Sequence, residues 1–216
     1  VSAGAVYIFS KNTGTWNQEA YVKASNTAAT DNFGVSIALA GDGQTLAVGA
    51  IGEDSGSAGV DSNQSDNSLL ESGATYIFVR NANHWSQQAY IKASNPGVDE
   101  FGWSVAISHD GSRLVVGALA EDGASTGMDG DQTSDGSTAS GAAYLFKRSG
   151  TKWEQMHYIK ASNTGGGDQF GSSVSISGDG LTLAIGAVGE SSGATGVNGQ
   201  QQDETVSSAG AAYILR

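Results

Sequence analysis

Three acidic segments carry the residue types with the clearest potential for chemistry. Segments 51–72, 119–140 and 188–209 hold 13 of the 22 acidic residues and no Lys or Arg. Each contains a Gly-x-(Asp/Asn) step followed by further oxygen-bearing side chains. Carboxylate and amide oxygens on Gly-rich loops suit Ca²⁺, and the lack of Cys or nearby His disfavours a soft metal. The sequence therefore predicts calcium sites formed by Asp61, Asn63 and Asp66, by Asp129, Asp131 and Asp135, and by Asn198, Asp203 and Glu204.

A second interpretation of these segments stays open. Asp, Asn and Ser side chains in polar loops commonly cap their own backbone turns, without a metal. The three segments have the same length of 22 residues, which argues against disorder. We expect the third to bind calcium more weakly, because Asn198 and Gln200 stand where the other two have charged or shorter donors.

Other kinds of site find little support. The three histidines, His84, His109 and His157, fall at non-equivalent places, and no nucleophile elbow, phosphate-binding loop or His-Glu-x-x-His motif occurs. The sequence therefore favours a protein that is not an enzyme. The net charge of −12 without a basic stripe argues against nucleic acid, and no apolar run is long enough to span a membrane.

The chain is built from three repeats. Phe101-Gly102 opens a strand that a turn at Asp110-Gly111 joins to a second strand, and the same unit starts 68 residues earlier and 69 residues later. Each cycle adds a Gly-Ala-x-Tyr strand and a strand that begins with Trp and ends with Tyr-(Ile/Val)-Lys. The predicted organisation is a single array, 1–216, with repeats at about 1–69, 70–138 and 139–206 and an extra strand at 207–216.

These motifs resemble the FG-GAP repeat, which builds the β-propeller of integrin α subunits and of many bacterial surface proteins. The resemblance implies an all-β fold of four-stranded antiparallel blades, about three in this chain, with the Phe-Gly strands innermost and the Trp strands outermost. The family's calcium loop, Asp-x-Asp-x-Asp-Gly, is reduced here to a single acid per repeat, which we expect to form turns: Asp42, Asp110 and Asp179. A further recurring acid precedes each Phe-Gly, as a ring of carboxylates or, as we expect, an acceptor of backbone amides: Asp31, Asp99 and Asp168.

Three blades are too few to close a propeller, so we expect another chain or further blades to complete the ring. The resemblance implies an extracellular or cell-surface binding or adhesion module, whose blade loops contact a glycan or protein partner. The alternative is a structural, self-assembling building block of a cell surface or filament. The long segments contain no aromatic residue, which disfavours a lectin.

Overall fold

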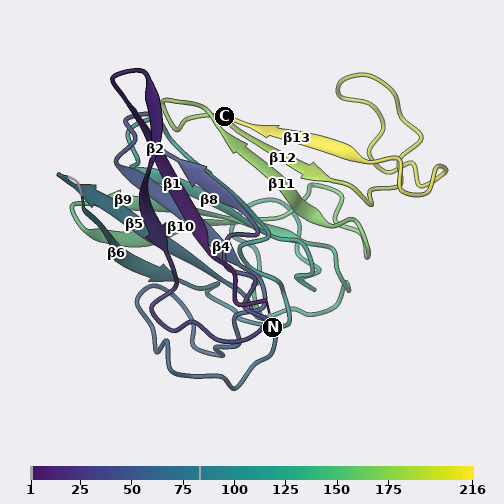
Figure 1. Ribbon diagram of the computed structural model, residues 1–216. Helices are drawn as coiled ribbons and strands as arrows, with labels where there is room; N and C mark the ends of the chain where they lie inside the picture. The colour runs from purple at the N-terminus through teal and green to yellow at the C-terminus, as the bar shows by residue number, and fades with distance from the viewer. Residues whose placement is uncertain (1, 83) are drawn as a thin grey trace.

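A computed structural model describes residues 2–82 and 84–216, and its described part consists of antiparallel sheets without a helix (Figure 1). The first sheet has two strands, β1 (Val6–Asn12) and β2 (Thr15–Val22). Two complete blades of four strands follow. They comprise β3 (Ile37–Leu39), β4 (Thr45–Ala50), β5 (Ala74–Asn81) and β6 (His84–Ile91), then β7 (Ser104–Ile107), β8 (Arg113–Ala118), β9 (Ala142–Ser149) and β10 (Lys152–Ile159). The last sheet has three strands, β11 (Phe170–Ile176), β12 (Leu183–Ala187) and β13 (Ala211–Leu215).

The blades are arranged as a partial β-propeller of about three blades, as the sequence predicts. Within each complete blade the strands lie in chain order, so the strand that follows Phe-Gly forms one edge and the Trp strand forms the other. The inner strand β7 packs against β3 on one side and β11 on the other. The predicted inner and outer strands are therefore confirmed.

Glycines let adjacent blades approach closely. Gly73, at the start of the third strand, has φ 76°, and a Cβ there would lie 2.2 Å from the carbonyl oxygen of Phe101 in the next blade. On the second strand, a Cβ on Gly49 would lie 2.0 Å from the carbonyl oxygen of Gly102. Any side chain at these positions would push the blades apart, which explains why the repeat needs glycine at both.

The inner strands of the complete blades are shorter than predicted. They begin at Ile37 and Ser104 instead of at Phe-Gly. The glycine of that pair has φ 97° in both, but Gly171 has φ 89° and β11 still begins at Phe170, so this angle alone does not set the start of the strand. The phenylalanine instead forms a single parallel bridge to the glycine that opens the third strand of the preceding sheet. Its side chain turns into its own blade, where the ring of Phe101 lies 5.3 Å from that of Tyr144.

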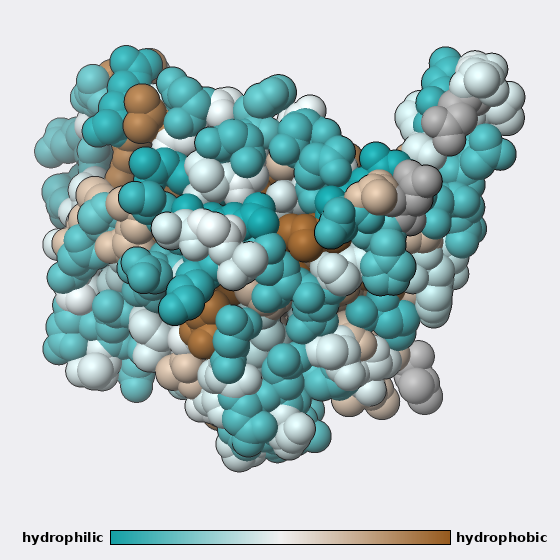
Figure 2. All heavy atoms as spheres, turned by 90° about the vertical axis from the view of Figure 1, so that its left-hand side faces the viewer, coloured by the Kyte–Doolittle hydropathy of each residue, from teal (hydrophilic) through white to brown (hydrophobic). Residues whose placement is uncertain are grey.

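The surface is mainly polar. Figure 2 shows the face on the left of Figure 1, where hydrophobic side chains form only small, separate patches. The described residues contain no helix of the length and apolarity that crossing a membrane requires.

Candidate functional site

Each complete blade contains a buried ion pair that fixes its outermost strand. The Nζ atom of Lys92 lies 2.8 Å from Oε2 of Glu53, and that of Lys160 lies 2.6 Å from Oε2 of Glu121. The glutamate comes from the long loop after the second strand, and the lysine directly follows the fourth strand. Burial lowers the pKa of both lysines below their ordinary value, and the paired glutamates oppose that shift.

The same loop also pairs with the free edge of the outermost strand. Gly59 accepts a hydrogen bond from the Lys92 amide at 3.0 Å, and Asp61 donates its amide to the Tyr90 carbonyl at 2.7 Å. The carboxylate of Asp61 in turn accepts the Tyr90 amide at 3.0 Å. The second blade repeats these contacts with Gly127, Asp129, Tyr158 and Lys160. The fourth strand is thus held between the third strand and the loop.

A Lys-Ala-Ser-Asn segment that recurs after the fourth strand connects one blade to the next. Asn95 donates to Glu121 at 3.4 Å and accepts the hydroxyl proton of Tyr144 at 2.8 Å, both in the following blade. Asn163 makes the corresponding contacts with Glu190 and Tyr213, at 3.0 and 2.6 Å. Glu53 and Glu121 therefore each receive an asparagine from the preceding sheet and a lysine from their own blade, whereas Glu190 receives the asparagine.

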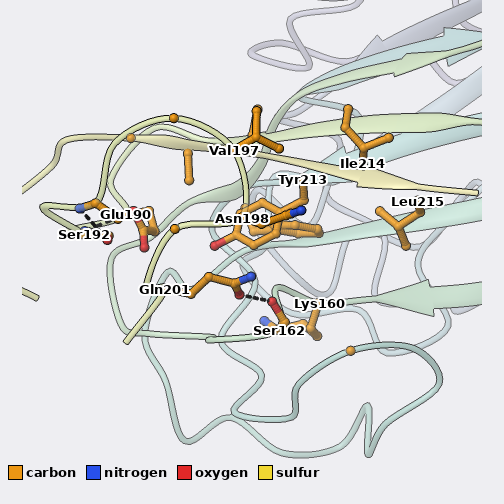
Figure 3. A pocket seen from close by; sticks show the side chains of 18 of the residues that line it. Lys160, Ser162, Glu190, Ser192, Val197, Asn198, Gln201, Tyr213, Ile214 and Leu215 are labelled. Carbon is orange, nitrogen blue, oxygen red and sulfur yellow. Dashed lines mark hydrogen bonds between the residues drawn. The ribbon is translucent and has the colours of Figure 1, made fainter. Parts of the chain in front are cut away.

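In the described residues the last sheet has three strands, so the edge of β13 that a fourth strand would cover borders an open slot. One wall is 210–215 and the other is the loop step Gly196-Val197-Asn198, and a pocket of about 690 Å³ lies between them (Figure 3). Ile214 is 60% exposed, whereas the equivalent Ile77 and Leu145 in the complete blades are 0% and 8% exposed. Val197 is 90% exposed for the same reason, since its counterpart Val60 bridges to Ile91.

Glu190 lines this slot and accepts hydrogen bonds from two uncharged donors. Its Oε1 accepts from the amide of Asn163 at 3.0 Å, and its Oε2 accepts from the backbone amide of Ser192 at 3.0 Å. These are the contacts that Glu53 makes with Asn26 and Ser55. Glu190 is 3% exposed, and the lysine of the complete blades has no counterpart beside it in the described residues. The slot therefore presents a buried carboxylate next to an unpaired strand edge.

Six of the nine predicted calcium ligands accept hydrogen bonds from the protein, four of them within their own loop. Asn63, Asp66, Asp131 and Asp203 each accept the backbone amide two residues later, at 2.9 to 3.1 Å. Asp61 and Asp129 hold the outermost strand, and Asp129 also lies 2.8 Å from Nδ1 of His157. The remaining three are exposed: Asp135, Asn198 and Glu204. In the described part of the chain, no group of three His, Cys, Asp or Glu side chains is placed to hold a metal ion.

The arrangement therefore fits turns and strand pairing better than a calcium cage, and calcium stays a prediction of the sequence alone. Because the carboxylates already have protein donors, we expect millimolar Ca²⁺ against EDTA to leave the melting temperature unchanged within about 1 °C. Differential scanning calorimetry at constant ionic strength measures this, with Mg²⁺ as the control for general screening. A melting temperature several degrees higher with Ca²⁺ but not with Mg²⁺ would instead support the predicted calcium sites.

The acids before each Phe-Gly cap backbone turns, as expected. Asp31, Asp99 and Asp168 are buried and accept the amides of Ala28, Gly97 and Gly165 at 2.6 to 2.8 Å. Burial, with the nearby charge of Glu121, raises the pKa of Asp99 to about 7. The turn acids Asp42, Asp110 and Asp179 are confirmed in the same way, since each accepts an amide two residues on.

The shift at Asp99 predicts a pH-dependent stability. A carboxyl with a raised folded-state pKa binds its proton more tightly when folded, so stability falls as the pH rises from about 4 to about 7. We expect Asp99→Asn to raise the free energy of unfolding by about 2 kcal/mol at pH 8 and to leave it nearly unchanged at pH 4, with urea melts as the measurement.

Asp110→Asn is the matched control. Hydrogen bonds from Ser108 and Ser112 lower the pKa of Asp110 to about 2, so its replacement should destabilise the protein at pH 8. Equal effects of Asp99→Asn at both pH values would contradict the assigned shift.

The sequence alone did not identify the slot. Glu53, Glu121 and Glu190 recur in phase, as do Lys92 and Lys160, but their pairing across 39 residues is visible only once the fold places them together. The sequence feature that could have predicted the ion pair is the recurrence of one Lys and one Glu at fixed positions of each repeat. Buried charges require partners, so two such recurring charges of opposite sign predict a pair.

The comparison with protein families agrees with this architecture. The family model of the FG-GAP repeat matches three times, over residues 16–78, 85–146 and 153–215. None of the curated proteins matches the sequence. Among solved structures, a chain of the Kuenenia stuttgartiensis hydrazine synthase is similar over 80% of this chain and 35% of its own length, with 14% identity and a TM-score of 0.41. The chain thus spans about a third of that protein. The three matches cover most of the sequence, and the chain belongs to the FG-GAP repeat family.

Proposed function

We propose that this chain is a non-enzymatic, extracellular or cell-surface binding module whose end sheets are completed by added strands, from a protein partner or from further blades. The observation that carries the proposal is the difference between the two inner blades, which have four strands, and the end sheets, which have two and three. An unpaired strand edge offers a row of backbone donors and acceptors to an extended segment of a partner.

The long loops support this partner class over a glycan. They contain no aromatic side chain on which a sugar ring could stack. Their carboxylates and amides already accept hydrogen bonds within the protein. In the described residues, the apolar side chains that are exposed in the end sheets but buried in the complete blades lie along the unpaired sheet edges.

Two binding assays test this proposal: selection of displayed random dodecapeptides on the immobilised chain, and binding of the labelled chain to a glycan array. We expect peptides to be enriched, and hydrogen exchange with a selected peptide to protect 210–215 or β1–β2. Backbone N-methylation of that peptide should abolish binding, because strand addition uses main-chain hydrogen bonds. Binding of glycans but not of peptides, or a footprint restricted to the outer tips of the loops, would contradict it.

Self-assembly is a second candidate, favoured by the exposed aromatic residues of the first sheet. Tyr7, Phe9 and Tyr21 are 54–57% exposed, whereas Tyr76, Phe78 and Tyr90, their counterparts in the first complete blade, are 0–4% exposed. Two copies joined end to end would bury these rings. Sedimentation velocity between about 1 and 100 μM measures this; a single monomeric species throughout would exclude it.

A further inference from the structure

We propose that copies of this chain stack head to tail, with the acidic loop face of one copy seated on the basic turn face of the next. The loop face consists of the loops after the second strands and the connections after the fourth strands, and the turn face consists of the tight turns after the first and third strands with the adjoining strand ends. Both are faces of complete blades, so the inference goes beyond strand addition at the sheet edges and does not depend on it.

The topology separates the charges of the chain between these two faces. Because neighbouring strands are antiparallel, the turns after the first and third strands lie at one end of each blade, and the segments after the second and fourth strands lie at the other. The loop face holds 17 of the 22 acidic residues and three of the ten basic residues. It therefore has 14 more acids than bases, whereas the rest of the chain has two more bases than acids.

Most acids of the loop face are available to a partner. Eleven of the 17 are not buried, and Asp129 is the one among these that forms an ion pair within the described residues. Lys92 and Lys160 are buried against their glutamates, so they do not offset the surface charge. A carboxylate that accepts one backbone amide keeps further lone pairs for a cationic donor. The hydrogen bonds within the loops therefore leave this face able to bind a basic surface.

The bases of the turn face are concentrated on the second blade. None of the four there is buried or forms an ion pair in the described residues: Arg113, Lys147, Arg148 and Lys152. Arg113 and Lys147 lie directly opposite each other on β8 and β9, with Glu154 facing Lys147 from β10. Like charges in a cross-strand pair are destabilising. The first blade has Thr45 and Val79 at these two positions, so the fold does not require the pair, and an anionic partner would relieve it.

The second blade carries both halves of the contact. Its loop 119–140 has five acids, at the opposite end of the blade from the four bases. A copy displaced along the strands of this blade would place that loop against the bases of the next copy. Such a contact uses a different surface on each partner, so it can repeat into a linear assembly. The net charge of −12 opposes approach mainly at long range, and a Debye length of about 8 Å at physiological ionic strength screens it.

Sedimentation velocity of the complete chain between about 1 and 100 μM tests the proposal. We expect reversible association at about 0.15 M NaCl that is at least about tenfold weaker at about 1 M, because exposed charge pairs are screened. Two charge reversals should each abolish self-association: Lys147→Glu with Lys152→Glu, and Asp131→Lys with Asp135→Lys. Mixing the two variants should restore association, because the acidic loop face of the first then meets the basic turn face of the second.

Lys11→Glu with Lys23→Glu is the matched control, since it changes the net charge equally but outside the second blade. It should leave association unchanged. The four side chains replaced in the reversals are exposed, so thermal melts should show folded variants, and the salt series on the unmodified chain is a second, independent measurement.

Several results would overturn the proposal. A monomer at every concentration and salt level would do so, as would a mixture of the two reversals that fails to associate. Equal weakening by the control would reduce the effect to net charge and contradict the assigned faces. Association that survives both reversals and about 1 M NaCl would assign self-assembly to the unpaired sheet edges, which overturns this inference and leaves the proposed function standing.

Discussion

Replacing Lys160 with methionine is expected to destabilise the protein by about 3–5 kcal/mol, because it leaves the buried carboxylate of Glu121 without a counter-charge. Lys160 is 3% exposed, and its ammonium group also donates to Ser140 at 2.7 Å. Urea unfolding monitored by tryptophan fluorescence measures the loss.

Two further variants show whether the loss comes from the unpaired charge. Lys23 occupies the same repeat position, but in the described residues it makes no ion pair with a glutamate, and its amine donates to the carbonyl of Gly4. Lys23→Met should therefore cost less than about 0.5 kcal/mol. Adding Glu121→Gln to Lys160→Met should recover a large part of the stability, since it removes the orphaned charge. Equal losses for Lys23→Met and Lys160→Met would show that the ion pair is not the cause.

Phe146→Ala is expected to cost about 3–5 kcal/mol, because it removes a fully buried ring from the wedge between blades. Phe146 is 0% exposed, and its ring lies 6.2 Å from that of Phe101 in an edge-to-face pair. It belongs to a buried cluster that includes Ile77, Leu114 and Tyr144, and close-packed side chains relax only partly into a cavity.

Phe9→Ala is the control at the same repeat position. Phe9 is 54% exposed on the first sheet, so its truncation should cost less than about 1 kcal/mol in the monomer. Thermal and urea unfolding of both variants measure the difference. A large loss for Phe9→Ala would mean that another copy or segment covers the first sheet in solution.

Much of the fold follows from repetition in the sequence. Phe-Gly, Gly-Ala and the Trp strand each recur in phase. A strand predicted from alternating apolar residues in one repeat is therefore supported by the same pattern in the other two. The order of strands within a blade followed from the family resemblance. The length of the inner strands did not, because the same Phe-Gly motif precedes or opens strands of 3, 4 and 7 residues.

The candidate site was harder to predict because it lies at a sheet edge that is unpaired in the described residues. Asp61 and Asp129 drew attention as acids in a charged loop, and the structure places them on the edge of the outermost strand. Glu190 looks in the sequence like any of the recurring glutamates. The repeats already predict an extra strand at 207–216, but the burial of Glu190 beside its unpaired edge is visible only in the structure.

Hydrogen exchange of the unliganded chain tests the central claim, the open edge of the last blade, most directly. The segment 210–215 pairs only with β12, whereas its counterpart 141–147 is covered on both sides by β8 and β10. Alternate amides of 210–215 should therefore exchange nearly as fast as those of exposed loops, while 141–147 should exchange only on global unfolding. Equal protection of the two segments would contradict the account, because it would mean that the slot is already filled.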